Sequence, residues 1–263
     1  MFLPIGDDNR DRTRTPYVTY LFIGINILVF ILLQGGTGDS PFTFAYATVP
    51  AEILTGDDIV TKSKVFRDAV TGQRFTMPGL EPTPIPVFLT LITSMFMHGG
   101  WAHLGGNVLF LWVFGDNIED SMGHQNYFFF YLLCGVLAGL AHVFTSAYLG
   151  QSVYIPSLGA SGAISGVLGG YILLHPLRTV RLWIFFFIIG VPAFIAVGLW
   201  FVFQLINGAG MLGGEESAGG VAYAAHIGGF IAGLFLVKLF TKNRRLVLIE
   251  KEESRRQAFN DEF

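Results

Sequence analysis

The side chains that could do chemistry in this chain are a serine, two histidines and an amide within apolar segments. Ser161 stands in the stretch Gly-Ala-Ser-Gly, 159–162, where its neighbours are small. A serine hydroxyl is a weak nucleophile and needs an adjacent base, for which His226 is the candidate. His103 and Asn107 are four residues apart, so they share one helix face and could donate hydrogen bonds to an oxyanion. These residue types predict acyl transfer to the serine.

The segments that carry these residues are apolar enough to lie in a membrane. Of the 263 residues, 52% are hydrophobic and 13% are charged, whereas a soluble domain has about 25% charged residues. A spanning helix needs about 20 apolar residues. The stretches that fit are 17–33, 87–114, 127–148, 159–174, 182–206 and 221–240. We therefore expect an all-α membrane protein with six transmembrane helices.

Helical rise places the candidate side chains at one depth of the expected bundle. At 1.5 Å per residue, Ser161, His226 and His103 each lie roughly 20–24 Å from the same end of their helices. In a hydrocarbon core about 30 Å thick, that layer lies several ångströms below one face. The last four apolar stretches contain no carboxylate. The sequence therefore predicts a Ser–His dyad and not a triad.

Lysines and arginines indicate which side faces the cytoplasm. They occur in the N-terminal arm 1–16, in the connection after the fourth helix and in the tail 241–263. The connections 149–158 and 207–220 have none. Because positive charge favours the cytoplasmic side, we expect the arm and the tail to be cytoplasmic on either side of a transmembrane domain, 17–240.

The first connection, 35–86, is a long polar loop with no recognisable motif. Its alternation of polar and apolar residues is too weak to predict a strand. A loop of this length is either functional or partly ordered, and the sequence assigns it no function.

Several motifs, in this order along the chain, resemble those of the rhomboid intramembrane serine proteases. They are the run HGGWAHLGGN from His98 to Asn107, the spaced residues Gly115, Glu119 and Gly123, the stretch 159–162, and Ala222 with His226, Gly229 and Gly233. The resemblance covers residues 17–240. It implies a rhomboid-like bundle with a water-filled catalytic cavity that opens to the outside.

The resemblance also implies roles for individual residues. Ser161 would be the nucleophile and His226 the base, and His103, Asn107 and the backbone N–H of Ser161 would stabilise the oxyanion. The substrates would be transmembrane proteins in a lipid bilayer. Because no seventh helix is present, we expect a bacterial inner (plasma) membrane. No cofactor, metal or nucleic acid is predicted, and the oligomeric state stays open.

Four further residues are expected to support the site, namely His98, Gly159, Gly229 and Gly233. His98 would hold the surrounding loop as an interfacial hydrogen-bonding residue. Gly229 and Gly233 would let the sixth helix approach the fourth.

Two positions depart from the family pattern. Where the family often has a Trp-Arg pair before the second helix, this chain reads Pro-Ile-Pro-Val at 84–87. Where some members place an aromatic ring that stacks on the base, four residues after the nucleophile, this chain has Ser165. His226 must then be oriented by something else.

Other interpretations use the same residues. Gly162 and Gly166 could form no more than a helix-packing face. A small transporter would be expected to show inverted repeats and a polar site at the midplane, and the sequence shows neither. A catalytically silent homologue that binds membrane proteins need not retain Ser161 and His226. A metalloprotease His-Glu-x-x-His motif is absent, and position 163 is alanine where a soluble hydrolase elbow needs glycine.

Overall fold

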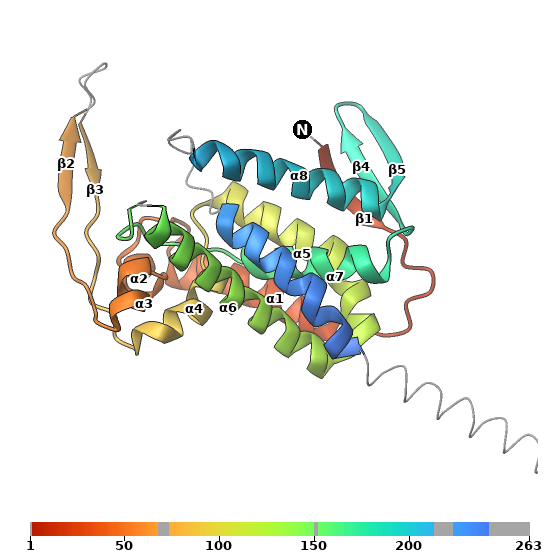
Figure 1. Cartoon of the computed structure of the whole chain (residues 1–263), viewed down its shortest axis with the longest axis horizontal. Coiled ribbons are helices and arrows are strands. Elements are labelled where there is room, and N and C mark those ends of the chain that lie inside the picture. The colour runs from red at the N-terminus through yellow and green to blue at the C-terminus, as the bar shows by residue number, and fades with distance from the viewer. Residues whose placement is uncertain (1, 68–73, 150–151, 213–222, 242–263) are drawn as a thin grey trace, which may run out of the picture.

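Helices form most of this computed structural model, which describes residues 2–67, 74–149, 152–212 and 223–241 (Figure 1). The helices are α1 (Tyr17–Leu28, extended by a π turn, Val29–Leu33), α2 (Pro41–Tyr46), α3 (Pro50–Thr55), α4 (Thr90–Thr93), α5 (Trp101–Met122), α6 (His124–Tyr148), α7 (Ser161–Leu174), α8 (Ala193–Leu212) and a last helix, Tyr223–Thr241. The strands are β1 (Phe2–Asp7), β2 (Lys64–Arg67), β3 (Arg74–Met77), β4 (Thr179–Ile184) and β5 (Phe187–Pro192).

Two of the described helices, α6 and Tyr223–Thr241, are long and apolar enough to cross a membrane by length and composition. Shorter apolar helices cover Tyr17–Leu33, Val87–Phe96, Ser161–Leu174 and Ala193–Ala209. The fold is thus mostly helical, and the apolar stretches predicted from the sequence contain most of its helices.

Helix α7 is the most deeply buried helix and packs against α5, α6 and α8. Small residues let its neighbours approach. A Cβ added to Gly162 would lie 2.7 Å from Cβ of Ala138 on α6. On the last helix, a Cβ at Gly229 or Gly233 would overlap the carbonyl oxygen of Gly162 or Gly166. These contacts bring the last helix directly against α7.

The prediction of one helix over 87–114 is wrong. A short helical segment, Val87–Phe96, ends before Gly99 and Gly100, and α5 starts only at Trp101. Two adjacent glycines weaken a helix because their backbone loses the most conformational entropy on ordering. Helix α5 then runs past residue 114 to Met122, since its polar last turns have partners in the N-terminal arm.

The prediction of a helix over 182–206 is also wrong in its first half. Strands β4 and β5 form an antiparallel hairpin there, with Phe185 and Phe186 in the turn. Segment 179–191 is rich in β-branched and aromatic residues, which favour strands, and α8 begins directly after Pro192, where a proline no longer interrupts a helix. Phe185 has φ 52°, which is unusual for a bulky residue.

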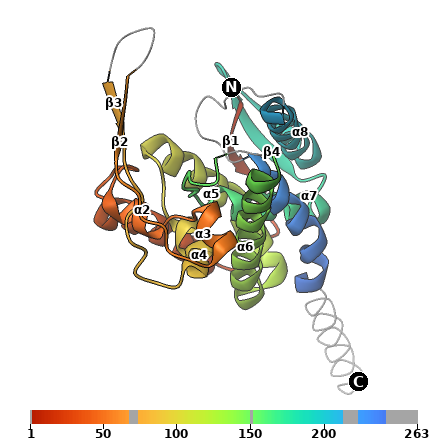
Figure 2. The same cartoon turned by 60° about the vertical axis from the view of Figure 1, so that its left-hand side comes forward.

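The expectation of an all-α protein therefore misses two small sheets. Strand β1 pairs antiparallel with β4 and completes a three-stranded sheet, β1-β4-β5. Strands β2 and β3 form a separate hairpin within the first connection. Figures 1 and 2 show the first sheet beside α8, while β2 and β3 project away from the helices.

The motif Gly115, Glu119 and Gly123 has a structural role in this fold. The buried carboxylate of Glu119 accepts hydrogen bonds from the backbone N–H of Val18 (2.9 Å) and from the N–H and hydroxyl of Thr19 (2.8 and 2.7 Å). It thus satisfies N–H groups at the start of α1, which have no acceptor within the helix. Gly123, with φ 80°, forms the tight link from α5 to α6.

A buried polar cluster attaches the N-terminal arm to the helices. Asp7 Oδ2 accepts hydrogen bonds from Asn117 Nδ2 (2.6 Å) and from the Tyr171 hydroxyl (2.5 Å). Arg178, just before β4, donates to the Asp8 carbonyl oxygen (2.6 Å) and pairs with Asp11 (2.7 Å). The arm is therefore tied to α5, α7 and the β4–β5 hairpin.

Asp7 makes the stability of this cluster depend on pH. Burial raises its pKa, although Tyr171, Asn117 and Arg178 favour the charged form. The folded protein therefore binds this proton more tightly than the unfolded chain, so the contribution of Asp7 to stability falls as the pH rises through the raised pKa. We expect Asp7→Asn, which keeps an acceptor oxygen, to unfold at a higher temperature than wild type near neutral pH. The difference should vanish at about pH 4.

Thermal unfolding in detergent at the two pH values measures this difference. A lower unfolding temperature for Asp7→Asn at neutral pH would mean that the ionised carboxylate stabilises the cluster through Arg178.

Candidate active site

The structure brings Ser161 and His226 into hydrogen-bonding contact, with 2.8 Å between Ser161 Oγ and His226 Nε2. Ser161 is the first residue of α7, and His226 lies in the first turn of the last helix. The glycine contacts between these helices set this distance, because a larger residue at Gly229 would push the last helix away. The pair has the arrangement of a nucleophile and its base.

His103 presents a donor near the serine. Its Nδ1 accepts a hydrogen bond from the backbone N–H of Gly99 (3.2 Å), so in a neutral ring the proton is on Nε2. Nε2 lies close to Gly159, where an added Cβ would be 2.9 Å from it and 3.6 Å from Ser161 Oγ. Gly159 also has φ 127°, which side chains rarely adopt. Glycine at position 159 thus leaves the space between His103 and Ser161 open.

Two further donors belong to the same region. Asn107 lies one turn after His103 on α5 and is 6% exposed. One amide hydrogen bonds to the His103 carbonyl oxygen (3.1 Å), which leaves the other hydrogen for a ligand. The backbone N–H of Ser161 lies in the first turn of α7, where such groups have no intrahelical acceptor and the helix dipole favours negative charge.

His98 lies beside His103, in a non-helical turn before α5. It is 0% exposed, and its ring packs edge-on against His103 with 5.2 Å between centroids. Its backbone N–H donates to Gln34 Oε1 (2.9 Å), and its carbonyl oxygen accepts from Gln34 Nε2 (3.0 Å). Among the described residues, its ring nitrogens have no hydrogen-bond partner, so the backbone makes the bonds that fix the turn.

A small cavity of about 40 Å³ lies beside Ser161. Its walls come from the link between α2 and α3, the segment before α5, α6, the start of α7 with the residues before it, and the last helix. They include small residues and hydroxyls such as Thr48, Ser94, Gly135 and Ser157. In the described part of the chain, no three His, Cys, Asp or Glu side chains gather as a metal site would require.

One residue beside the Ser161–His226 pair was not predicted from the sequence. Gln204 on α8 is 5% exposed, and its Oε1 lies 2.8 Å from His226 Nδ1. It is the only amide side chain in the otherwise apolar run 193–206. A polar side chain in such a run is a signal of function, and this signal could have identified it.

Comparison with known proteins agrees with these observations. Residues 87–243, more than half of the chain, match the family model described as Rhomboid domain. The chain is 32% identical over 168 residues to Rhomboid protein 1, mitochondrial, of Saccharomyces cerevisiae, a match that covers 64% of this chain and 45% of that protein. It is 30% identical over 234 residues to Rhomboid protease GluP of Bacillus subtilis, covering 86% of this chain and 38% of that protein.

The chain thus spans less than half the length of these two relatives. The family match nevertheless includes His98, His103, Asn107, Ser161 and His226, which lie within residues 87–243. The chain therefore belongs to the rhomboid family of membrane proteins.

Proposed function

We propose that the protein is an intramembrane serine endopeptidase that cleaves transmembrane-anchored proteins through a dyad of Ser161 and His226. The observation that carries this proposal is the 2.8 Å contact between Ser161 Oγ and His226 Nε2. The family match and the printed name of the Bacillus relative, a rhomboid protease, support it.

In the proposed reaction, His226 Nε2 takes the hydroxyl proton as Ser161 Oγ attacks the carbonyl carbon of the peptide bond. The negative charge that develops on the carbonyl oxygen is stabilised by His103 Nε2–H, the free amide hydrogen of Asn107 and the backbone N–H of Ser161. His226 then gives its proton to the leaving amine. A water molecule, deprotonated by the same histidine, hydrolyses the acyl-enzyme and releases Ser161.

The proposed setting is a bacterial inner membrane that the chain crosses six times. The spans are α1 with its π turn, α5, α6, α7, α8 and Tyr223–Thr241. The arm 1–16 and the tail 241–263 are cytoplasmic, which agrees with their positive charges. This orientation puts Ser161, at the start of α7, toward the outer face of the bilayer.

Labelling by a fluorophosphonate tests the proposal. The full chain is purified in detergent, treated with a fluorescent fluorophosphonate and, in parallel, reconstituted with a single-span test substrate. We expect wild type to be labelled and to cut the substrate, and Ser161→Ala to do neither while keeping its unfolding temperature. A wild-type protein that is folded but neither labelled nor active would point to a silent binding homologue or a transporter.

A further inference from the structure

We infer that Gln204 is a positioning residue that holds His226 in the tautomer and orientation of a general base. The inference rests on the proposed function, since it assigns the partner of the base in the same dyad. It also answers the question that Ser165 raises, namely what orients the imidazole when no aromatic ring stacks on it from α7.

The two ring nitrogens of His226 have different partners. Nδ1 lies 2.8 Å from Gln204 Oε1, and Nε2 lies 2.8 Å from Ser161 Oγ. A neutral imidazole carries one N–H, and the carbonyl oxygen of an amide can only accept. The proton is therefore on Nδ1, and Nε2 keeps the lone pair that accepts the serine proton. The other tautomer would place two lone pairs against each other at 2.8 Å.

Other groups around His226 do not supply this bond. His103 on α5 and His142 on α6 lie near it, and the ring of Tyr223 lies 6.4 Å away between centroids. None of the three is hydrogen-bonded to it in the described structure. Ser165 turns its hydroxyl back to the Ser161 carbonyl oxygen (2.6 Å). The ring of Trp200 lies beside His226, with 6.0 Å between centroids, but offers no acceptor at Nδ1.

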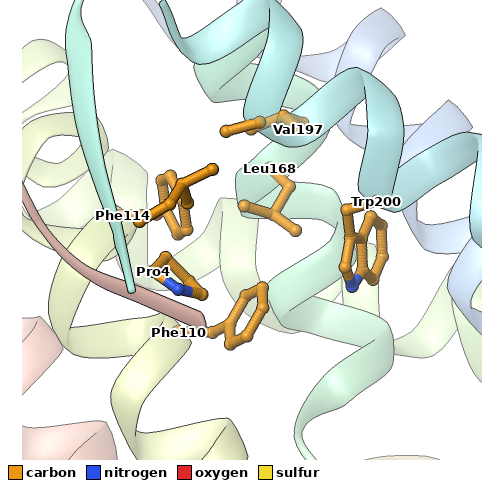
Figure 3. A pocket seen from close by; sticks show the side chains of 8 residues that line it. Pro4, Phe110, Phe114, Leu168, Val197 and Trp200 are labelled. Atoms are coloured by element: carbon orange, nitrogen blue, oxygen red, sulfur yellow. The ribbon is translucent and has the colours of Figure 1, made fainter. Parts of the chain in front are cut away.

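The face of α8 that carries Gln204 is fixed by apolar packing. Trp200 lies four residues earlier and so shares this face. Figure 3 shows Trp200 and Val197 from α8 near Phe110 of α5 and Leu168 of α7, around a narrow apolar pocket. A buried amide on this face lowers the stability of the protein unless it is hydrogen-bonded. A leucine would fill a similar space without lowering it. The hydrogen bond to His226, and not packing, therefore accounts for an amide at position 204.

The test compares three variants of the full chain in detergent. Gln204→Leu removes the acceptor at similar volume, and Gln204→Glu keeps an acceptor oxygen. Asn207→Leu is the matched control, because Asn207 is a half-buried amide on the same helix that donates to the backbone carbonyl oxygen of Phe203 (2.7 Å). For each we measure kcat and KM with the test substrate, the rate of fluorophosphonate labelling and the unfolding temperature. The small reagent reports on the dyad without requiring a transmembrane substrate to bind.

For Gln204→Leu we expect kcat and the labelling rate to fall together by about 10- to 100-fold, the range found for partners that orient metal-ligating histidines. KM and the unfolding temperature should stay at or above the wild-type values. Gln204→Glu should recover most of both rates, and Asn207→Leu should match wild type.

Two results would overturn the inference. One is labelling of Gln204→Leu at the wild-type rate while Ser161→Ala is not labelled, which would leave the proposed function intact. The other is an equal loss in the Leu and Glu variants together with a lower unfolding temperature, which would make Gln204 a packing residue. Labelling of Ser161→Ala at the wild-type rate would instead refute the proposed function itself.

Discussion

His226→Ala is expected to lower the rate of substrate cleavage by about 10⁴-fold or more. Ser161 Oγ then has no base at 2.8 Å to take its proton, and a neutral serine is a poor nucleophile. The measurement is cleavage of a fluorogenic transmembrane peptide in liposomes, with the unfolding temperature recorded to show that the variant is folded.

His142→Ala is the matched control for this loss. His142 lies on α6 in the same bundle, and no hydrogen bond joins it to Ser161 in the described structure. It should retain most of the activity. If both alanine variants lost activity to the same extent, the effect would belong to the general packing of the bundle and not to a specific base.

Asn107→Ala is expected to lose kcat, whereas His98→Ala is expected to lose stability. Removing one oxyanion donor lowers kcat by roughly 10²- to 10³-fold. For Asn107→Ala we expect a loss of kcat near the lower end of this range, because His103 and the Ser161 N–H remain as donors. The unfolding temperature of Asn107→Ala should change little, since the hydrogen bond of this amide in the described structure is to its own helix. His98 is fully buried against His103, so His98→Ala should leave a cavity and lower the unfolding temperature.

Measuring kcat and thermal unfolding for both variants separates the two roles. Activity of His98→Ala should fall in step with its stability and recover at lower temperature. A stable His98→Ala protein with a selective loss of kcat would show that the oxyanion histidine has been wrongly assigned.

The helices that sequence analysis located well are those whose apolar runs have no internal break. Tyr17–Leu33, α6 and α7 follow the predicted stretches closely. The hairpin β4–β5 was missed because hydropathy alone does not distinguish a buried helix from apolar strands. Strand β4 pairs with its neighbour β5 and also with β1, near the start of the given sequence, and this distant second partner leaves no local signal.

The depth of the candidate site residues could be predicted from the sequence, but the contacts between their helices could not. Helical rise put Ser161, His226 and His103 in one layer because depth depends only on position along a helix. The bond from His226 to Gln204 depends on how α8 is rotated, and the packing of Trp200 and its neighbours sets that rotation. A hydrogen bond between side chains of two helices therefore needs the packed structure to be seen.

The pairing of β1 with β4 has a consequence for the order in which the chain folds. Strand β1 is synthesised before the helices, yet Phe2 pairs with Ile184 and Asp7 with Val180. Until the ribosome has made β4, which starts at Thr179, the first strand has no edge to bind, while α1, α5, α6 and α7 are already made. Closing so long a loop is slow compared with forming contacts between neighbouring helices. Strand β1 is thus made before α1, α5, α6 and α7 but reaches its native position after them, and a chain stopped before residue 179 leaves β1 unpaired.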